Sequence, residues 1–125
     1  MGFTTLTLVV ANPARPAKTI PIEFLIDSGA IYSVVPKTIL KKLGIKPIAT
    51  QTFTLADGTK ISRRRGTAHF VYKDHVGGAD VLFGEKDDST LLGVLTLESL
   101  GLGLNPLKRE LIAIPMMLAA NRTAR

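Results

Sequence analysis

A single carboxylate interrupts an apolar stretch early in the chain. Residues 24–26 read Phe-Leu-Ile, and Asp27 follows at once, before Ser28 and Gly29. Burying an unpaired carboxylate costs on the order of several kcal/mol, so this position calls for a partner, a proton or a chemical role. A protected carboxyl group is suited to giving or taking a proton in acid–base catalysis. Asp-Ser-Gly alone, however, is typical of an ordinary turn.

Other polar side chains are weaker candidates for chemistry. His69 falls in a predicted strand and His75 in a predicted turn, and neither has a partner at the spacing that metal ligands need. The pair Asp87-Asp88 lies in a polar loop, where acidic residues are usually solvated. Ser33 could join a histidine and an aspartate in a hydrolase, but the chain has no Gly-x-Ser-x-Gly elbow. The chain also has no cysteine, which excludes disulfides, thiolate chemistry and cysteine-ligated zinc. We expect no metal and no other cofactor.

The elements that lead to the carboxylate are predicted to be strands. Thr alternates with Leu or Val over residues 4–10, which is the period of a half-buried strand. A second strand over 19–26 ends at the carboxylate. Residues 11–18 are expected to form a loop between them, because Pro13 and Pro16 block a strand.

A helix and a tight hairpin are predicted next. The helix covers residues 36–43, with Pro36 at its first position and Gly44 as its terminator. The dipeptide Asp57-Gly58 supplies the positive φ angles of a tight primed turn. The strands that it joins are expected over residues 51–55 and 59–62.

The second half of the chain is also predicted to be rich in strands. Residues 91–106 should begin as a short strand and continue as one or two helical turns, which Gly101 and Gly103 would stop. A turn is expected at 75–78 and a polar loop at 84–90. The remaining strands are expected over residues 66–73, 80–83 and 111–118, the last edged by Pro115.

Four segments, taken in order, resemble the retroviral-type (retropepsin-like) aspartic proteases. They are Asp27-Ser28-Gly29-Ala30 after an apolar strand, the hairpin at Asp57-Gly58, Leu91-Leu92-Gly93 with helical residues 94–100, and the closing strand 111–118. The resemblance covers most of the chain from about Ile20 onward. It implies an all-β fold with one or two short helices, the closed, barrel-like half of a pepsin-type enzyme.

The resemblance implies an aspartic endopeptidase. Peptide hydrolysis by this route needs two carboxylates around one water, one taking a proton from the water and the other protonating the scissile carbonyl oxygen. The chain contains only one Asp-Ser/Thr-Gly sequence. The second carboxylate would therefore come from Asp27 of a second copy, in an isologous homodimer. The route requires no metal and no covalent intermediate.

The family's roles pass to the residues that match its motifs. Asp27 would be catalytic, the Ser28 hydroxyl would bond across the dimer, and Gly29 and Ala30 would complete the active-site loop. The flap that closes over substrate would turn at Ala56, Asp57 and Gly58. Leu91, Leu92 and Gly93 would pack behind the active-site loop, and the core there would be filled by Tyr32, Val34 and Val35.

Three positions differ from related enzymes. Ile31 and Val94 stand where retroviral members commonly carry an acidic residue and an arginine that pair, so the two changes together leave no orphan charge. Ala30 stands where pepsin-like enzymes often carry Ser, and it cannot donate a hydrogen bond that favours a charged carboxylate. We therefore expect activity from mildly acidic to near-neutral pH.

Composition limits the partners that we expect. The 125 residues suit one domain, over 1–118, with a flexible tail over 119–125. The net charge is +6, and its one dense run is Arg63-Arg64-Arg65, after Lys60. Such a short run is typical of a solvated strand end or loop, and no nucleic-acid-binding signature accompanies it, so nucleic acid is not expected. Without a membrane span or a signal peptide, a cytoplasmic location is expected.

Two functions remain open from the sequence. The first is the endopeptidase, acting on an extended peptide or protein substrate. The second is a non-catalytic dimerisation or peptide-binding module with the same fold. The intact Asp27-Ser28-Gly29 favours catalysis, because a binding module has no physical reason to keep a costly carboxylate pair at a dimer axis.

Overall fold

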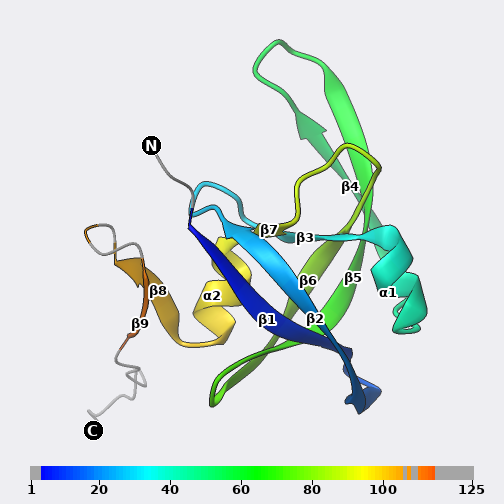
Figure 1. Ribbon diagram of the computed structural model, residues 1–125. Coiled ribbons are helices and arrows are strands. Elements are labelled where there is room, and N and C mark those ends of the chain that lie inside the picture. The colour runs from blue at the N-terminus through cyan, green and yellow to red at the C-terminus, as the bar shows by residue number, and fades with distance from the viewer. Residues whose placement is uncertain (1–3, 106, 108–109, 115–125) are drawn as a thin grey trace, which may run out of the picture.

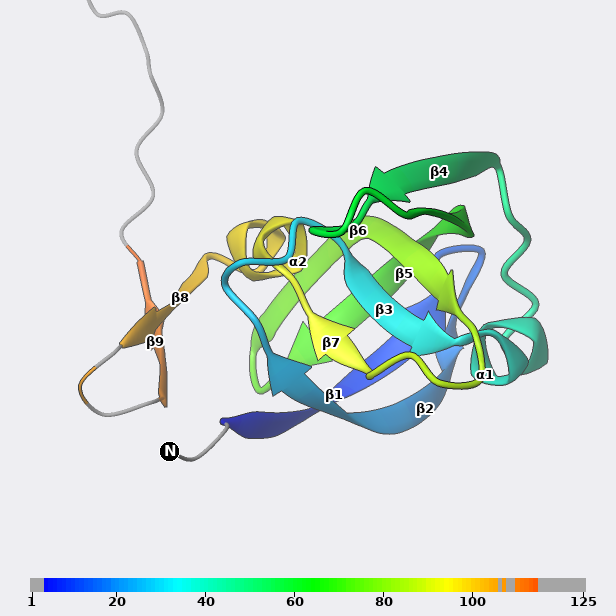
Figure 2. The same ribbon diagram turned by 90° about the horizontal axis from the view of Figure 1, so that it is seen from above.

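Six strands close into a barrel around one apolar core, and a seventh extends the sheet outside it (Figure 1, Figure 2). The computed structural model describes residues 4–105, 107 and 110–114. Its elements are β1 (Thr5–Asn12), β2 (Arg15–Ile26), β3 (Ser33–Pro36), α1 (Lys37–Lys42), β4 (Ala49–Thr54), β5 (Lys60–Tyr72), β6 (His75–Gly84), β7 (Leu91–Leu92), α2 (Val94–Ser99), β8 (Leu102–Asn105) and β9 (Glu110–Ala113). No helix among these residues is long and apolar enough to span a membrane.

The barrel closes because β1 pairs on both of its sides. The sheet order is β1-β2-β7-β3-β6-β5-β4, and residues 9–11 of β1 also pair with β5. Strand β4 is bonded only to β5 and lies outside the ring. Alternate residues of each strand point inward, so Leu8, Val10, Phe24 and Phe70 are buried, with the two phenylalanine rings 6.1 Å apart. The mainly β architecture with two short helices is as expected.

The first hairpin has a shorter connection than the loop expected over 11–18, because β1 and β2 both extend into that range. The expectation that Pro16 blocks a strand is wrong. Asn12 pairs with Arg15, whereas the residue before Asn12 pairs with Thr19. Pro16 therefore lies in a bulge on β2, where the ladder requires no N–H group from it.

Helix α1 is confirmed, one residue shorter at each end than expected. Pro36 is the last residue of β3 and the N-cap of the helix, with φ −51° and ψ 133°, rather than the first helical residue. Gly44 ends the helix with φ 77°, and its N–H donates to the Lys41 carbonyl oxygen at 2.9 Å. The following Ile45 is buried in the core.

The hairpin of β4 and β5 is confirmed, but its turn is not of the primed type. A primed turn of type I′ needs positive φ at both central residues, whereas Gly58, with φ 88°, is the one turn residue that has it. The Gly58 N–H donates to the Leu55 carbonyl oxygen at 2.9 Å. The Leu55 N–H in turn donates to the Thr59 carbonyl oxygen at 2.7 Å. These bonds define a type I turn followed by a left-handed glycine.

Strand β5 joins the two strands that were expected over 59–62 and 66–73. The arginine run 63–65 lies in the middle of this strand and pairs with residues 49–51 of β4. The expectation that the run is a strand end or a loop is therefore wrong. The arginines interrupt the alternation of apolar and polar residues in the sequence, but the backbone hydrogen bonds between β4 and β5 continue through them.

Strand β6 begins at His75, so the turn expected at 75–78 is wrong. The chain reverses two residues earlier, where Lys73 adopts a φ of 55°. Gly77 lies in the strand for a steric reason. A Cβ there would be 2.6 Å from the Ser99 carbonyl oxygen, at the end of α2. Glycine therefore lets α2 approach β6 closely.

The chain leaves the barrel after β7. Strand β7 and helix α2 are confirmed, and Gly101, with φ 72°, follows the helix as its terminator. Gly103 is not a terminator, because it lies within β8. Among the described residues, strands β8 and β9 pair only with each other, and they project beside α2 (Figure 1). Residues 115–118 of the expected closing strand and the tail 119–125 lie outside the described residues.

The glycines of β6 provide a test of this packing. Gly77→Ala should lower the free energy of unfolding by about 1–3 kcal/mol, because overpacking forces α2 away from the sheet. Gly78→Ala is the matched control, since a Cβ there would meet its nearest atom, the Ala68 carbonyl oxygen, at 3.7 Å. Urea unfolding measures both, and equal effects of the two substitutions would contradict the close approach.

Candidate active site

Asp27 follows the last residue of β2 and is half-buried in a turn at the end of the strand. Its backbone N–H donates to the Leu92 carbonyl oxygen at 3.1 Å, which continues the parallel pairing of β2 with β7. One carboxylate oxygen accepts the Gly29 N–H at 2.9 Å. The Ala30 N–H closes the turn on the Asp27 carbonyl oxygen at 3.1 Å. The carboxylate is thus fixed at the barrel end and is not inside the core.

Helix α2 holds the next part of this loop. The Ala30 carbonyl oxygen accepts the Val94 N–H at 2.8 Å, and the Ile31 carbonyl oxygen accepts the Leu95 N–H at 3.1 Å. The first N–H groups of a helix lack partners within the helix, and α2 has no side-chain cap. The loop carbonyls therefore cap the helix, and the helix in turn positions the loop.

A buried hydroxyl pair ties the same two elements together. Ser33 and Thr96 have no exposed surface, and their hydroxyl oxygens are 2.5 Å apart. The Ser33 oxygen also accepts the Gly93 N–H at 2.9 Å. A Cβ at Gly93 would lie 2.6 Å from the Tyr32 carbonyl oxygen, so only glycine fits there. Ser33 is therefore a structural residue and is not available as a nucleophile.

A groove of about 710 Å³ opens above the Asp27 carboxylate. Of the residues predicted for the site, Asp27, Gly29, Ala30 and Leu91 line it. Ser28 is exposed beside it, and Leu92 is buried behind it with Gly93. The remaining lining is mainly apolar and comprises Leu25, Ile31, Tyr32, Val34, Phe53, Thr54, Leu55, Ile61, Arg63, Leu82, Asp87, Asp88 and Ser89.

The β4–β5 hairpin contributes its stem to the groove, and its tip lies away from it. Ala56, Asp57 and Gly58 are exposed and do not line the groove, and the hairpin projects past the barrel (Figure 1). Within the tip, one Asp57 carboxylate oxygen accepts the Thr59 N–H at 2.9 Å. This backbone hydrogen bond lowers the pKa of Asp57 below its ordinary value.

Tyr32 connects the active-site loop to the hairpin. Its ring meets that of Phe53 of β4 edge to face, with centroids 6.4 Å apart. The Arg65 guanidinium lies 5.8 Å from the centre of the Tyr32 ring. The expectation that Tyr32 and Val34 fill the core is wrong, because both line the groove, whereas Val35 is fully buried as expected.

A bidentate ion pair forms part of the groove lining. The Arg63 guanidinium donates to both Asp88 carboxylate oxygens, at 2.6 and 2.9 Å. One of these oxygens also accepts the Glu85 N–H at 2.8 Å. The hydrogen bond from Arg63 lowers the pKa of Asp88, and the same bond raises the pKa of Arg63. Asp88 is thus a loop anchor, and the expectation of a merely solvated carboxylate is wrong for it.

The histidines lie apart from the groove. His69 is in β5 as expected, and His75 is the first residue of β6, with its Nδ1 atom 3.1 Å from the Leu100 carbonyl oxygen. Within residues 4–105, 107 and 110–114, no three side chains of His, Asp or Glu are grouped as metal ligands would be.

Comparison with solved structures identifies the fold. The chain is similar to the protease of simian foamy virus, with a TM-score of 0.51 and 20% identity over 74% of this chain and 92% of that one. It is also similar to a retropepsin-like aspartic protease from Rickettsia conorii, with a TM-score of 0.51 and 22% identity over 83% of this chain and 77% of that one. The closed barrel with its projecting hairpin is a retropepsin-like fold.

The sequence itself gives the family. Residues 13–96 match the aspartyl protease family, and this match covers more than half of the chain. The chain therefore belongs to the aspartyl protease family and has a retropepsin-like fold, as its motifs indicated. A comparison with curated proteins gave no significant match.

Two features of the site were missed by the sequence analysis. The only trace of the Ser33–Thr96 pair in the sequence is weak: each residue is a small hydroxyl side chain inside an apolar segment. The Arg63–Asp88 pair joins a strand to a loop 25 positions away, and no local pattern relates two such residues.

The pH dependence of stability tests the Arg63–Asp88 pair. The pKa of Asp88 is lowered from its ordinary value of 3.8, so the folded state binds this proton less readily than the unfolded chain. The stabilisation is fully present well above pH 3.8 and is lost as pH falls through the lowered pKa. Solvent screens the pair, so Asp88→Asn should cost about 1 kcal/mol at pH 7.

The measurement is urea unfolding at a series of pH values, with Asp87→Asn as the matched control. Asp87 is exposed and forms no ion pair within the described part of the chain. The difference between Asp88→Asn and the parent should shrink as pH drops below 3.8. A difference that stays constant across this range would show that the ion pair does not cause it.

Proposed function

We propose that the protein is an aspartic endopeptidase whose active site forms from Asp27 of two copies of the chain. The observation that carries the proposal is the position of the Asp27 carboxylate. It lies on a rigidly held turn at the floor of a mainly apolar groove, in a chain of the aspartyl protease family.

The chemistry requires two carboxylates that share one proton, as is well established for aspartic proteases as a class. Like charges at such short range cannot both ionise, so one carboxylate acts as the base and the other as the acid. The base takes a proton from the attacking water, while the acid protonates the carbonyl oxygen of the scissile bond. Asp27 of one protomer supplies the first group and Asp27 of its partner the second.

Surface features around Asp27 support a partner copy. The Ser28 side chain is exposed and makes no hydrogen bond within the described residues. Ile31 is 63% exposed, and Leu95, at the start of α2, is 37% exposed. An apolar side chain as exposed as Ile31, beside a hydroxyl without a partner, suits a two-fold contact in which both become covered.

The groove suits an extended peptide with apolar side chains. Most of its lining is apolar, and its charged groups are Asp27, Asp87 and the Arg63–Asp88 pair. The flap assigned to Ala56, Asp57 and Gly58 has an exposed tip, so it is free to bend over a bound peptide and exclude water. We propose main-chain hydrogen bonds to the flap and apolar pockets for the substrate side chains.

Asp27→Asn is the first test. The substitution keeps the shape of the side chain but removes the shared proton and the base, so turnover should fall by at least about a thousandfold. A peptide-library digest between about pH 3 and 8 measures activity, and sedimentation measures the oligomeric state. Because Ala30 offers no hydroxyl to the carboxylate, activity should be highest from mildly acidic to near-neutral pH. If Asp27→Asn stays dimeric but loses turnover, the result supports Asp27 as the catalytic residue. If the parent protein cleaves no peptide, the endopeptidase is rejected and the peptide-binding module becomes the better assignment.

Mixing the two proteins tests whether the site is shared. At concentrations where the chain is dimeric, adding a ninefold excess of Asp27→Asn to the parent should lower the total activity to about a tenth, because most parent chains then pair with an inactive partner. The matched control is the same excess of an inert protein. Activity that does not change on mixing would show that each chain works alone.

A further inference from the structure

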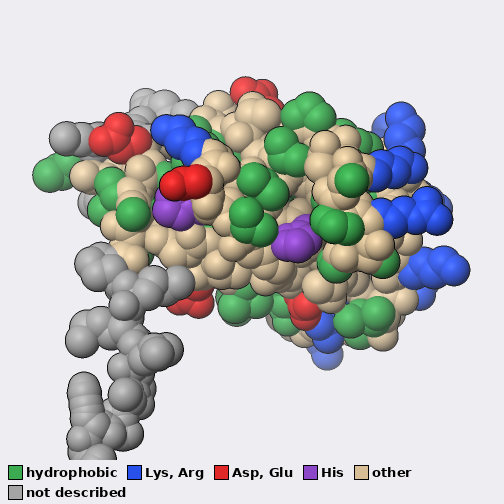
Figure 3. Space-filling view, turned by 90° about the horizontal axis from the view of Figure 1, so that it is seen from below, with side chains coloured by type: hydrophobic (Ala, Val, Ile, Leu, Met, Phe, Trp, Pro, Cys, Tyr) green, Lys and Arg blue, Asp and Glu red, His purple; other side chains and the backbone are tan. Residues whose placement is uncertain are grey.

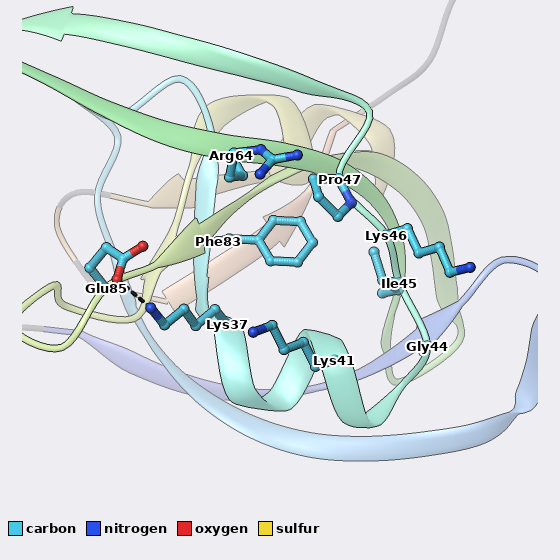
Figure 4. Close-up of a pocket in the computed structure, with 9 residues that line it drawn as sticks. All are labelled: Lys37, Lys41, Gly44, Ile45, Lys46, Pro47, Arg64, Phe83 and Glu85. Carbon is cyan, nitrogen blue, oxygen red and sulfur yellow. Dashed lines mark hydrogen bonds and ion pairs between the residues drawn. The ribbon is translucent and has the colours of Figure 1, made fainter.

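A second cavity, of about 480 Å³, lies at the base of the β4–β5 hairpin (Figure 4). It shares no lining residue with the groove above Asp27. Its walls come from α1, the segment 44–47 that leads to β4, strand β5, and the end of β6 with the loop that follows. Ile45 and Phe83 are buried at its floor, and Pro47 lies at its side.

The charge of this cavity is strongly unbalanced. Lys37, Lys41, Lys46 and Arg64 line it, with Glu85 as the only carboxylate among its lining residues. Glu85 binds Lys37, with the ammonium nitrogen 2.6 Å from a carboxylate oxygen. The other three cations have no hydrogen-bond or ion-pair partner for their side chains within the described residues. Figure 4 shows them around the Phe83 ring, with Lys46 reaching outward.

The arginine run on β5 is divided between the two faces of the strand. Arg63 binds Asp88 and Arg65 binds Asp80, so both serve to hold the fold together. Arg64 points to the opposite face, because side chains alternate along a strand, and it is the member of the run that lines the cavity. The cation without an internal partner is thus the one that faces an open cavity.

The surrounding surface is also basic. Figure 3 shows lysine and arginine side chains along the edge of the molecule where α1 and the β1–β2 turn lie. Like charges that converge without partners raise the energy of the folded protein. An anionic occupant would relieve this repulsion, and the apolar floor would accept the methylene groups of its side chains.

We propose that this cavity is an exosite for an acidic segment of the substrate, beyond the residues held in the groove. The inference rests on the proposed function, because it takes the occupant to be part of the cleaved polypeptide. Two structural connections support it. Arg64 adjoins Arg63 of the groove on β5, and Glu85 of the cavity lies in the same loop as Asp87 and Asp88 of the groove. The groove and the cavity thus lie on the two faces of β5 and share the loop after β6, so a chain leaving the groove could reach the cavity around that loop or around the edge of the hairpin.

The residue types favour carboxylates of a peptide over a nucleic acid. Proteins that bind single strands present exposed aromatic rings on which bases stack, whereas Phe83 in this cavity is only 4% exposed. Lys41 and Arg64 face one cavity, whereas a phosphate backbone would need cations that follow a line along the cavity. Lysine ammonium groups on flexible stems suit separate carboxylates of a peptide.

The test compares two peptides with the same cleaved sequence, taken from the library digest, and an extension of about five residues long enough to reach the cavity. One extension consists of Glu and the other of Gln, and each is placed at either end. The parent should show a kcat/KM for the Glu peptide that is about three- to tenfold higher, since exposed ion pairs contribute modestly and salt screens them.

The double substitution Lys41→Gln with Arg64→Gln should bring this ratio close to one. The matched control is Lys42→Gln with Arg15→Gln, which removes the same charge from exposed residues outside the cavity and should keep the ratio. Lys41→Glu alone lowers the net charge of the lining from +3 to +1, so it should reduce the preference for Glu without reversing it. A parent with no preference, or a cavity variant that keeps the preference, would overturn the exosite.

Binding to the Asp27→Asn protein separates this inference from the proposed function. Fluorescence anisotropy of a labelled peptide with an apolar segment and the Glu extension should show binding that Lys41→Gln with Arg64→Gln weakens about three- to tenfold, even if the parent cleaves nothing. A parent protein that cleaves nothing while the Glu peptide still binds rejects the protease and keeps an acidic-peptide site. An oligothymidylate of equal charge that binds more tightly, and loses its binding in the same variant, would overturn the assignment to a peptide.

Discussion

The position of the Asp27 carboxylate depends on backbone groups that would otherwise lack partners. Helix α2 has no side-chain cap, and the carbonyl groups of Ala30 and Ile31 take its first N–H groups. The buried Ser33 hydroxyl then binds the Gly93 N–H just before the helix. Because each element satisfies the other, the loop cannot shift without leaving several buried polar groups unpaired, which is costly. The rigidity of the site therefore comes from the helix behind it and not from the carboxylate itself.

Two of the three arginines in the run on β5 are also used to hold the structure together. Arg63 attaches the loop after β6 to β5 through Asp88, and Arg65 holds Asp80 on the neighbouring strand while lying over Tyr32. Two members of the arginine run thus hold neighbouring elements together, and the Arg63–Asp88 pair also lines the groove. The third member, Arg64, has no such task and faces the second cavity. One strand thus carries structural charge on one face and unpaired charge on the other.

Much of this architecture could be predicted from the sequence, and the limits are physical. The strands with clear alternation, the Asp27 turn and the short helix after Leu91-Leu92-Gly93 were all evident, because local pattern and burial agree there. The bulge at Pro16 and the long β5 were not, since pairing with neighbouring strands overrode the local signals of proline and arginine. Gly77 was taken for a turn residue because only the approach of α2 reveals its purpose. The Ser33–Thr96 and Arg63–Asp88 contacts are tertiary and leave no trace in spacing.

The attachment of β4 has a mechanical consequence. This strand is bonded only to β5, while the six other strands of the sheet form a closed ring. The hairpin is therefore hydrogen-bonded to the barrel only through β5. Bending of its tip, residues 55–59, opens no backbone hydrogen bond of the ring. Motion at the entrance to the groove therefore leaves the barrel intact, while the Phe53–Tyr32 contact holds the stem of the hairpin to the active-site loop.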